Sequence, residues 1–330
     1  MQGNVSSPFF TIHTPTYKRV AYLTRLWEAL CNQTYKDFEW IVADDGSDDG
    51  TLELLINLKK RSPFPVTIIA ASKRVGKTTL DNRAIKSAKG RIFIWNDSDD
   101  FLLPGALDLI YNAWNAIPLS ERAGYCGITA LCEENGHIVS SPLPFSGPFD
   151  STWSDLRYRH KVTGDMLYAC RTDILRSYLP PEVDFYVAEG SFWAPIGAKY
   201  KTRILDKVVQ KKEYQATNCI TFSGKMKYCR GYVYTIAMSI GFSMPSNDKK
   251  FILSTSLLRQ LITYFRYAIH GDVSMIKAYS MLPYKLPLLM FLSVLPFSAF
   301  FALKDIIQGK VSKTHLEFNS AIKSATFKTY

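Results

Sequence analysis

The chain has 330 residues, of which 47% are hydrophobic and 21% are charged. This length and composition are those of a globular protein with one or two domains, and they exclude a disordered or fibrous chain. The formal net charge of +11 is unevenly placed, because residues 1–195 carry a net −3 and residues 196–330 a net +14. The basic C-terminal part predicts an anionic partner, either nucleic acid or an acidic membrane surface.

The first 115 residues alternate between strand and helix patterns. Short apolar or β-prone runs predict strands at residues 9–12, 38–43, 66–71 and 91–95. Helical periodicity predicts helices at residues 20–33, 51–58, 78–88 and 107–116. Buried strands separated by amphipathic helices predict an α/β fold with a mostly parallel sheet and helices on both faces.

Beyond residue 116 the pattern changes to shorter β pieces. Strands are expected at residues 125–132, 138–141, 166–170 and 202–205, and helices at 172–178 and 189–200. Residues 141–150 are rich in Pro, Ser and Gly, which predicts a loop. We expect one domain over residues 1–215, with halves at 1–115 and 116–215, and a helical region over 216–330.

The helical region contains eighteen uncharged residues, 286–303, with basic residues on either side. Eighteen residues are at the short end of the range for a membrane-spanning helix. Three interpretations stay open: a helix lying in the membrane interface, a spanning helix, and a core helix or oligomer contact. Basic charge beside apolar surface favours the membrane interpretations, on the inner leaflet.

The six cysteines predict neither a zinc site nor disulfides. No two are spaced as CxxC, and a chain of this size can build a core without cross-links. Residues 1–7 lack the basic and apolar stretches of a secretory signal. We therefore expect buried thiols in a protein of the cytoplasm.

Acidic residues follow two of the predicted strands. Residues 44–51, which include Asp45, follow the second strand, and Asp97, Asp99 and Asp100 follow the fourth. Ligands of open α/β sheets bind at such carboxyl ends of strands. The crowded second cluster predicts a hard divalent cation, Mg²⁺ or Mn²⁺, held together with substrate phosphates. The alternative for both segments is a solvated acidic turn that caps the next helix.

Two further segments are weaker signals. Residues 73–78 end in Gly76-Lys77-Thr78, but Ala71 stands where a P-loop requires its first glycine, so a P-loop is excluded. This basic segment can still contact phosphates, or it is a solvated loop. Glu189 opens an apolar helix, where a carboxylate is favoured by the helix dipole alone.

Together these segments resemble a family 2 glycosyltransferase with the GT-A fold. Four elements match in order over about residues 8–115: residues 14–19, 44–51, 76–82 and 97–100. A weaker match at Gly164-Asp165 and residues 186–193 resembles the acceptor half of bacterial polysaccharide and O-antigen transferases. One departure is that Glu189 is followed by Gly190, where many members have adjacent acidic residues.

The resemblance implies a role for each matching residue. Thr14, Thr16 and Tyr17 would border the nucleotide base, and Asp45 would hydrogen-bond it. Asp97 would contact the ribose or the metal, while Asp99 would be the main metal ligand and Asp100 a second candidate. Lys77 and Asn82 would lie near the donor. Glu189 would be the general base that acts on the acceptor.

The implied reaction is an inverting sugar transfer from a nucleotide-diphosphate donor, UDP being expected, to a glycan or lipid-linked acceptor. The main alternative is a catalytically degenerate nucleotide-sugar-binding subunit or scaffold. A sugar nucleotidyltransferase would require a Gly-rich, Arg-containing loop after the first strand, where His13-Thr14-Pro15-Thr16-Tyr17 stands. Nucleic-acid binding is disfavoured because the aromatic residues of the basic part lie among long aliphatic runs. An oligomer is possible.

Overall fold

The computed structural model describes residues 7–180, 182–183, 187–213, 228–243, 255–282, 288–310 and 325–330. It divides into two compact units. The sheet unit contains residues 1–179, 199–216 and 320–330, and the helical unit contains residues 180–198 and 217–319. The main boundary lies next to the expected one. Two segments fall on the other side of it: residues 180–198 belong to the helical unit and residues 320–330 to the sheet unit.

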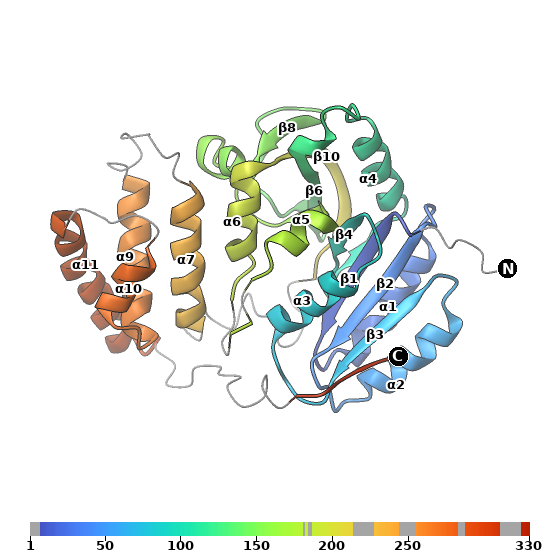
Figure 1. Ribbon diagram of the computed structural model, residues 1–330, viewed down its shortest axis with the longest axis horizontal. Coiled ribbons are helices and arrows are strands. Elements are labelled where there is room, and N and C mark those ends of the chain that lie inside the picture. The colour runs from blue at the N-terminus through green and yellow to red at the C-terminus, as the bar shows by residue number, and fades with distance from the viewer. Residues whose placement is uncertain are drawn as a thin grey trace. The chain divides into compact units, whose positions relative to one another are not determined.

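The first half of the sheet unit is a parallel βα array (Figure 1). Its strands are β1 (Phe10–Thr16), β2 (Phe38–Asp44), β3 (Val66–Ala71) and β4 (Ile92–Trp95). They lie in the order β3-β2-β1-β4 and are parallel to one another. The helices between and after them are α1 (Val20–Cys31), α2 (Thr51–Arg61), α3 (Lys77–Ser87) and α4 (Ala106–Asn115). Every strand and helix predicted in this half is confirmed, with shifts of a few residues at the ends.

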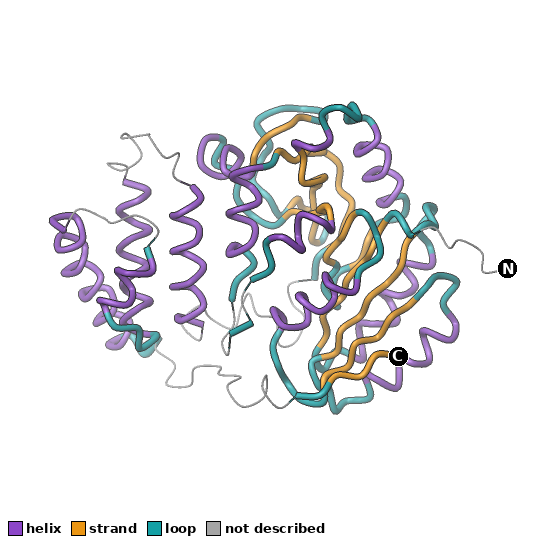
Figure 2. The backbone as a smooth tube through the Cα atoms, viewed as in Figure 1, coloured by secondary structure: helices purple, strands orange, loops and turns teal. Residues whose placement is uncertain are grey.

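The second half extends the same sheet with mixed pairing (Figure 2). Its longer strands are β6 (Tyr125–Glu134), β9 (Met166–Arg171) and β10 (Lys201–Lys211), and the helix α5 (Thr172–Ser177) follows β9. β9 is antiparallel to both β4 and β6, whereas β10 is parallel to β6. The short strands are β5 (Phe101–Leu102), β7 (His137–Ile138), β8 (Phe149–Thr152) and β11 (Phe327–Thr329). β11 is antiparallel to β3, so the end of the chain completes the sheet edge.

Alternation along β1 explains how both faces of the sheet are covered. Phe10 and Ile12 belong to the large core that also holds buried residues of α1, α2 and α4. His13 lies on the opposite face, where its Nε2 is 2.8 Å from Asp81 Oδ1 on α3. A central parallel strand is therefore buried on both sides, as its unbroken burial shows.

The helical unit contains α6 (Gly190–Lys199), α7 (Cys229–Ser243), α9 (Thr255–His270), α10 (Met275–Met281) and α11 (Leu288–Ile307). Helices α7, α9 and α11 pack around a core of apolar and aromatic residues that includes Tyr264, Phe265 and Val294. Cys126, Cys132, Cys170 and Cys229 are buried free thiols, as expected, and Cys31 is half-buried. Residues 186, 219, 286 and 287, on which expectations were placed, lie outside the described residues.

Candidate active site

The predicted ligand-binding segments meet at the carboxyl edge of the parallel strands. Thr16 and Asp44 are paired at the ends of β1 and β2, and residues 96–100 follow β4. The backbone N–H of Asp45 donates to Thr16 O at 2.9 Å, and that of Asn96 donates to His13 O at 2.8 Å. The strand order thus brings together segments that are about 30 to 80 residues apart in sequence, as the pattern predicted.

Asp45 is the buried carboxylate of this edge. Its Oδ1 accepts hydrogen bonds from the backbone N–H of Val75 at 2.6 Å and of Gly76 at 3.0 Å. Burial raises the pKa of Asp45 to about 6, although these two hydrogen bonds and the nearby Arg74 oppose the shift. Asp45 therefore links the end of β2 to the start of α3 by hydrogen bonds. Its ionised form carries a desolvation penalty, because the carboxylate is buried.

The loop after β2 and the loop before α3 are in close contact. A Cβ on Gly46, which has φ +73°, would lie 2.7 Å from the backbone of Lys73, so only glycine fits there. The guanidinium of Arg74 lies 4.3 Å from the centre of the Tyr17 ring. The two loops and Tyr17 thus form one packed wall of the site.

The two predicted threonines have different surroundings. Thr14 Oγ1 accepts a hydrogen bond from Trp40 Nε1 at 3.0 Å inside the core. Thr16 Oγ1 is buried and has no hydrogen-bond partner among the described residues. Thr16 is therefore the hydroxyl with capacity left for a ligand, whereas Thr14 supports the strand from within.

The acidic segment after β4 is matched by basic side chains. Lys77 Nζ lies 3.2 Å from Asp97 Oδ1, Arg19 3.4 Å from Asp99 Oδ2, and Lys212 2.6 Å from Asp100 Oδ2. Three cations thus offset the repulsion that the sequence led us to assign to a metal ion alone. Asn82, on α3, is buried.

These pairs affect the three carboxyl groups differently. Desolvation alone would raise the pKa of Asp97, but Lys77 and Lys212 outweigh it and hold that pKa at about 2. Burial, followed by the charge of Asp97, raises the pKa of Asp99. Burial also raises the pKa of Asp100, with Lys212 opposing the shift. Asp97 is the most strongly ionised of the three groups.

The residues suited to a divalent cation are Asp97 and Asp99. Among the described residues, no three His, Cys, Asp or Glu side chains are grouped as a metal cage. Asp100 is committed to Lys212, and its side chain is only 5% exposed. Mg²⁺ usually takes one or two carboxylates and completes its shell with substrate phosphates and water, which two carboxylates can satisfy. Asp97, with 40% of its side chain exposed, is accessible for this.

Lys212 is the site residue that the sequence did not reveal. It directly follows β10, and a buried hydrogen bond from Gln210 Nε2 to Asn96 Oδ1, 2.9 Å long, ties that strand to the acidic segment. The expected strand ended at residue 205, and nothing in the sequence distinguished Lys212 from Lys207 or Lys211.

Glu189 belongs to the helical unit, where its carbonyl accepts the backbone N–H groups of Phe192 and Trp193 at the start of α6. Its side chain is half-buried. Its role as general base stays a prediction.

The parallel βα array and the acidic segment at its carboxyl edge define a GT-A α/β domain. Residues 11–137 match the family model "Glycosyl transferase family 2". This part of the chain belongs to that family, as the four matching segments indicated. The structure of S. aureus TarS residues 1–349 in complex with UDP-GlcNAc has the same fold, with a TM-score of 0.56 at 18% identity, over 91% of this chain and 92% of that one.

Two curated relatives cover parts of the chain. A Campylobacter jejuni protein named GalNAc(5)-diNAcBac-PP-undecaprenol beta-1,3-glucosyltransferase is 26% identical over 192 residues, which are 56% of this chain and 59% of that protein. Escherichia coli chondroitin synthase is 35% identical over 102 residues, 31% of this chain and 15% of that protein. The match therefore covers less than two thirds of either relative.

Proposed function

We propose that the chain is a metal-dependent inverting glycosyltransferase that uses a nucleotide-diphosphate sugar, with UDP as the nucleotide. One observation carries the proposal: three carboxylates lie at one edge of the sheet, within the residues that match the family. Asp45 is buried there, and Asp97 and Asp99 are each paired with a basic side chain. The names of both relatives describe sugar polymers or sugar transfer, and the TarS structure contains UDP-GlcNAc, which supports the donor class.

On this proposal the donor is held by the sheet edge. Asp45 accepts a hydrogen bond from the base, Thr16 supplies its uncommitted hydroxyl, and Tyr17 forms the wall beside the base. Arg74 lies on the loop before α3 and Lys77 is the first residue of that helix, and their charges suit the diphosphate. Charge complementarity of this kind acts most strongly on the leaving diphosphate, because negative charge develops there.

Asp97 and Asp99 would hold Mg²⁺ or Mn²⁺. When bound, the ion would supply positive charge that stabilises the departing diphosphate. Without that charge, Lys77 holds Asp97 ionised, and Arg19 favours the ionised form of Asp99 against the effect of burial.

Glu189 is the proposed general base. It would take the proton of an acceptor hydroxyl while that oxygen forms a bond to the anomeric carbon and the bond to the diphosphate breaks. The nucleoside diphosphate leaves with the electron pair, and an α-linked donor gives a β-linked product. The "beta-1,3" in the name of the C. jejuni relative is the outcome expected of such a reaction.

The acceptor is proposed to be a glycan or a lipid-linked glycan, in cell-surface polysaccharide synthesis at the inner face of the membrane. The C. jejuni relative is named for an undecaprenol-linked glycan. Within the described residues, Met290–Ile307 is the one helix segment long and apolar enough to cross a membrane, and only 22% of it is buried. An exposed apolar helix suits an enzyme that works beside a lipid carrier.

Glu189→Gln tests the catalytic part of the proposal. We expect transfer to fall by about 10²–10⁴-fold, the usual contribution of a general base, with donor affinity unchanged. Glu182→Gln, at an exposed glutamate of the same unit, is the matched control. Donor binding without transfer in the wild-type protein would instead support the second candidate, a binding subunit or scaffold. This candidate is motivated by Gly190, which stands beside Glu189 where many family members have a second acidic residue.

A further inference from the structure

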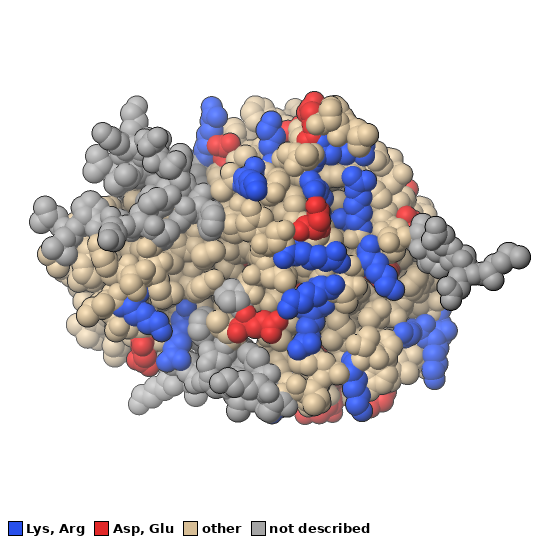
Figure 3. Space-filling view, in the orientation of Figure 1, with Lys and Arg blue, Asp and Glu red and all other residues tan. Residues whose placement is uncertain are grey.

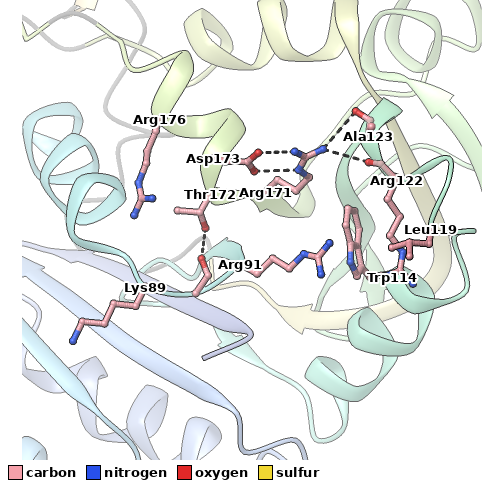
Figure 4. A pocket seen from close by; sticks show the side chains of 11 residues that line it. Lys89, Arg91, Trp114, Leu119, Arg122, Ala123, Arg171, Thr172, Asp173 and Arg176 are labelled. Atoms are coloured by element: carbon pink, nitrogen blue, oxygen red, sulfur yellow. Dashed lines mark hydrogen bonds and ion pairs between the residues drawn. The ribbon is translucent and has the colours of Figure 1, made fainter. Parts of the chain in front are cut away.

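A second hollow lies at the other end of β4, in the sheet unit. The acidic segment follows β4, whereas Lys89, Gly90 and Arg91 precede it and line a cavity of about 510 Å³ (Figure 4). This volume is within the range of about 300–1,000 Å³ that small-molecule sites occupy. The remaining lining residues are Trp114, Leu119, Arg122, Ala123, Arg171, Thr172, Asp173 and Arg176.

The charges around this cavity are strongly unbalanced. Five basic side chains line it, and Asp173 is the single acidic one. Asp173 is already paired with Arg171, which donates to both of its carboxylate oxygens. Within the described residues, the side chains of Lys89 and Arg91 have no carboxylate partner, and both residues are exposed. In Figure 3, blue side chains gather over α3, α4 and α5 with few red ones among them.

The other arginines are fixed in place by backbone oxygens. Arg122 donates to Ile117 O and Asn115 O, both at 2.9 Å, and Arg176 donates to Ile85 O at 3.2 Å. These bonds hold long side chains at the rim, which lowers the entropy that a ligand would otherwise have to remove.

Trp114 underlies one side of the cavity. The guanidinium groups of Arg91 and Arg122 lie 5.5 Å and 5.9 Å from its ring centre, and Figure 4 shows them gathered with Arg171 on that side. The indole N–H of Trp114 is buried without a hydrogen-bond partner in the part of the chain that the structure describes. The ring is fully buried, so it forms a fixed surface against which the two guanidinium groups lie.

The turn that carries Lys89 and Arg91 is itself held from below. Glu39 Oε1 accepts the backbone N–H of Lys89 at 2.5 Å and of Gly90 at 3.3 Å. A Cβ on Gly90 would lie 2.3 Å from Thr11 N, so the turn needs glycine to sit this close to β1. The fold therefore fixes the backbone positions from which the two basic side chains extend.

From these contacts we propose that the cavity binds a ligand carrying two or more phosphate groups, as an oligophosphate or phosphodiester chain. Guanidinium forks match phosphate oxygens, and several cations in one hollow favour a ligand with several charges. The site is separate from the proposed donor site, at the opposite end of the same strand, and does not depend on the glycosyltransferase proposal.

The test is a titration of the full chain with tripolyphosphate, comparing Lys89→Gln/Arg91→Gln with Lys59→Gln/Lys60→Gln. The control pair lies in the last turn of α2, is exposed, and loses the same charge. We expect the pocket variant to bind at least about tenfold more weakly, because it loses two cations that can form charge-assisted hydrogen bonds to phosphate oxygens. The control should stay within about twofold of wild type. If Arg91→Gln disturbs folding, Lys89→Gln alone, at an exposed side chain, should still weaken binding.

Equal weakening in both pairs, or no binding of tripolyphosphate to wild type, would overturn the proposal. Vesicles of phosphatidylglycerol, compared with phosphatidylcholine, separate the two sources of phosphate. Loss of tripolyphosphate binding with unchanged vesicle binding assigns the cavity to a soluble phosphate chain. Loss of both assigns it to lipid headgroups as well.

Discussion

Asp45 carries a conflict between stability and binding. On the proposed function its carboxylate accepts a hydrogen bond from the base, yet only 5% of the residue is exposed and its pKa is raised to about 6. A carboxyl whose pKa is raised on folding binds its proton more tightly in the folded state. It therefore destabilises the fold as pH rises from about 4 to 6, and this penalty persists at neutral pH. Such a cost is characteristic of a functional residue.

Asp45→Asn should therefore raise the free energy of unfolding at pH 7, by up to about 3 kcal/mol, while it weakens nucleotide binding. Urea unfolding at pH 7 and at pH 4 measures the effect. The gain should vanish at pH 4, where the wild-type carboxyl is protonated. Asp48→Asn, on the same loop but exposed, is the control. An Asp45→Asn protein less stable than wild type at pH 7 would show that the ionised carboxylate supports the fold.

The same pKa predicts a pH dependence for donor binding. Below about pH 6 Asp45 takes up a proton and loses acceptor capacity, so affinity for a nucleotide sugar should fall as pH decreases from 7 to 5. A nucleotide sugar is the suitable ligand because its diphosphate is doubly esterified and does not titrate near pH 6. Calorimetric titration across this range checks the prediction. Asp45→Asn should bind weakly with a flat profile, and a wild-type profile that is also flat would remove Asp45 from the contact.

At the scale of elements, α11 combines a buried charge cluster with an exposed apolar surface. Asp305 is buried, and it accepts hydrogen bonds from Arg266 of α9 at 2.5 Å and lies 3.1 Å from His270 Nε2. Its charge is therefore compensated inside the unit. The outward surface carries large apolar side chains instead: Leu292, Phe297, Phe300, Leu303, Ile306 and Ile307. A mostly exposed helix of this kind disfavours the core interpretation.

Phe297→Glu/Phe300→Glu should weaken binding to phosphatidylglycerol vesicles by at least about tenfold, since burying one such side chain contributes about 1.5–3 kcal/mol. Vesicle flotation measures the bound fraction. Ile138→Glu/Phe145→Glu adds the same charges at exposed apolar residues of the sheet unit and should leave binding within about twofold. If wild type stays in solution with these vesicles, the membrane role of α11 is wrong.

At the scale of the whole chain, the sequence predicted what depends on local pattern. The four parallel strands and their helices were predicted because each is a buried run or an amphipathic period. β5, β8 and β11 were not predicted. A segment of two to four residues becomes a strand only when it pairs with residues distant in sequence, as Phe327 pairs with Ala71. The acidic residues of the candidate site were predicted, because they cluster along the chain. Its basic partner Lys212 was missed because it reaches Asp100 across 112 residues of sequence.

The basic cavity was missed for the same reason. Charge along the sequence placed the positive excess after residue 195, whereas the cavity gathers Lys89, Arg91, Arg122, Arg171 and Arg176 from the nearly neutral part. Separate turns bring these side chains together only in the folded sheet unit.

The central claim is a metal-assisted nucleotide site at the carboxyl edge of the sheet. Its most direct test is a titration of the purified chain with UDP, GDP, CDP, ADP and dTDP, with and without Mn²⁺, on wild type, Asp99→Asn and the exposed control Glu53→Gln. We expect one nucleoside diphosphate, UDP, to bind at least about tenfold more tightly with Mn²⁺. Asp99→Asn should abolish that gain and Glu53→Gln should keep it. Nucleotide binding that is unchanged by Mn²⁺ and by Asp99→Asn, or no binding of any nucleotide, would contradict the account.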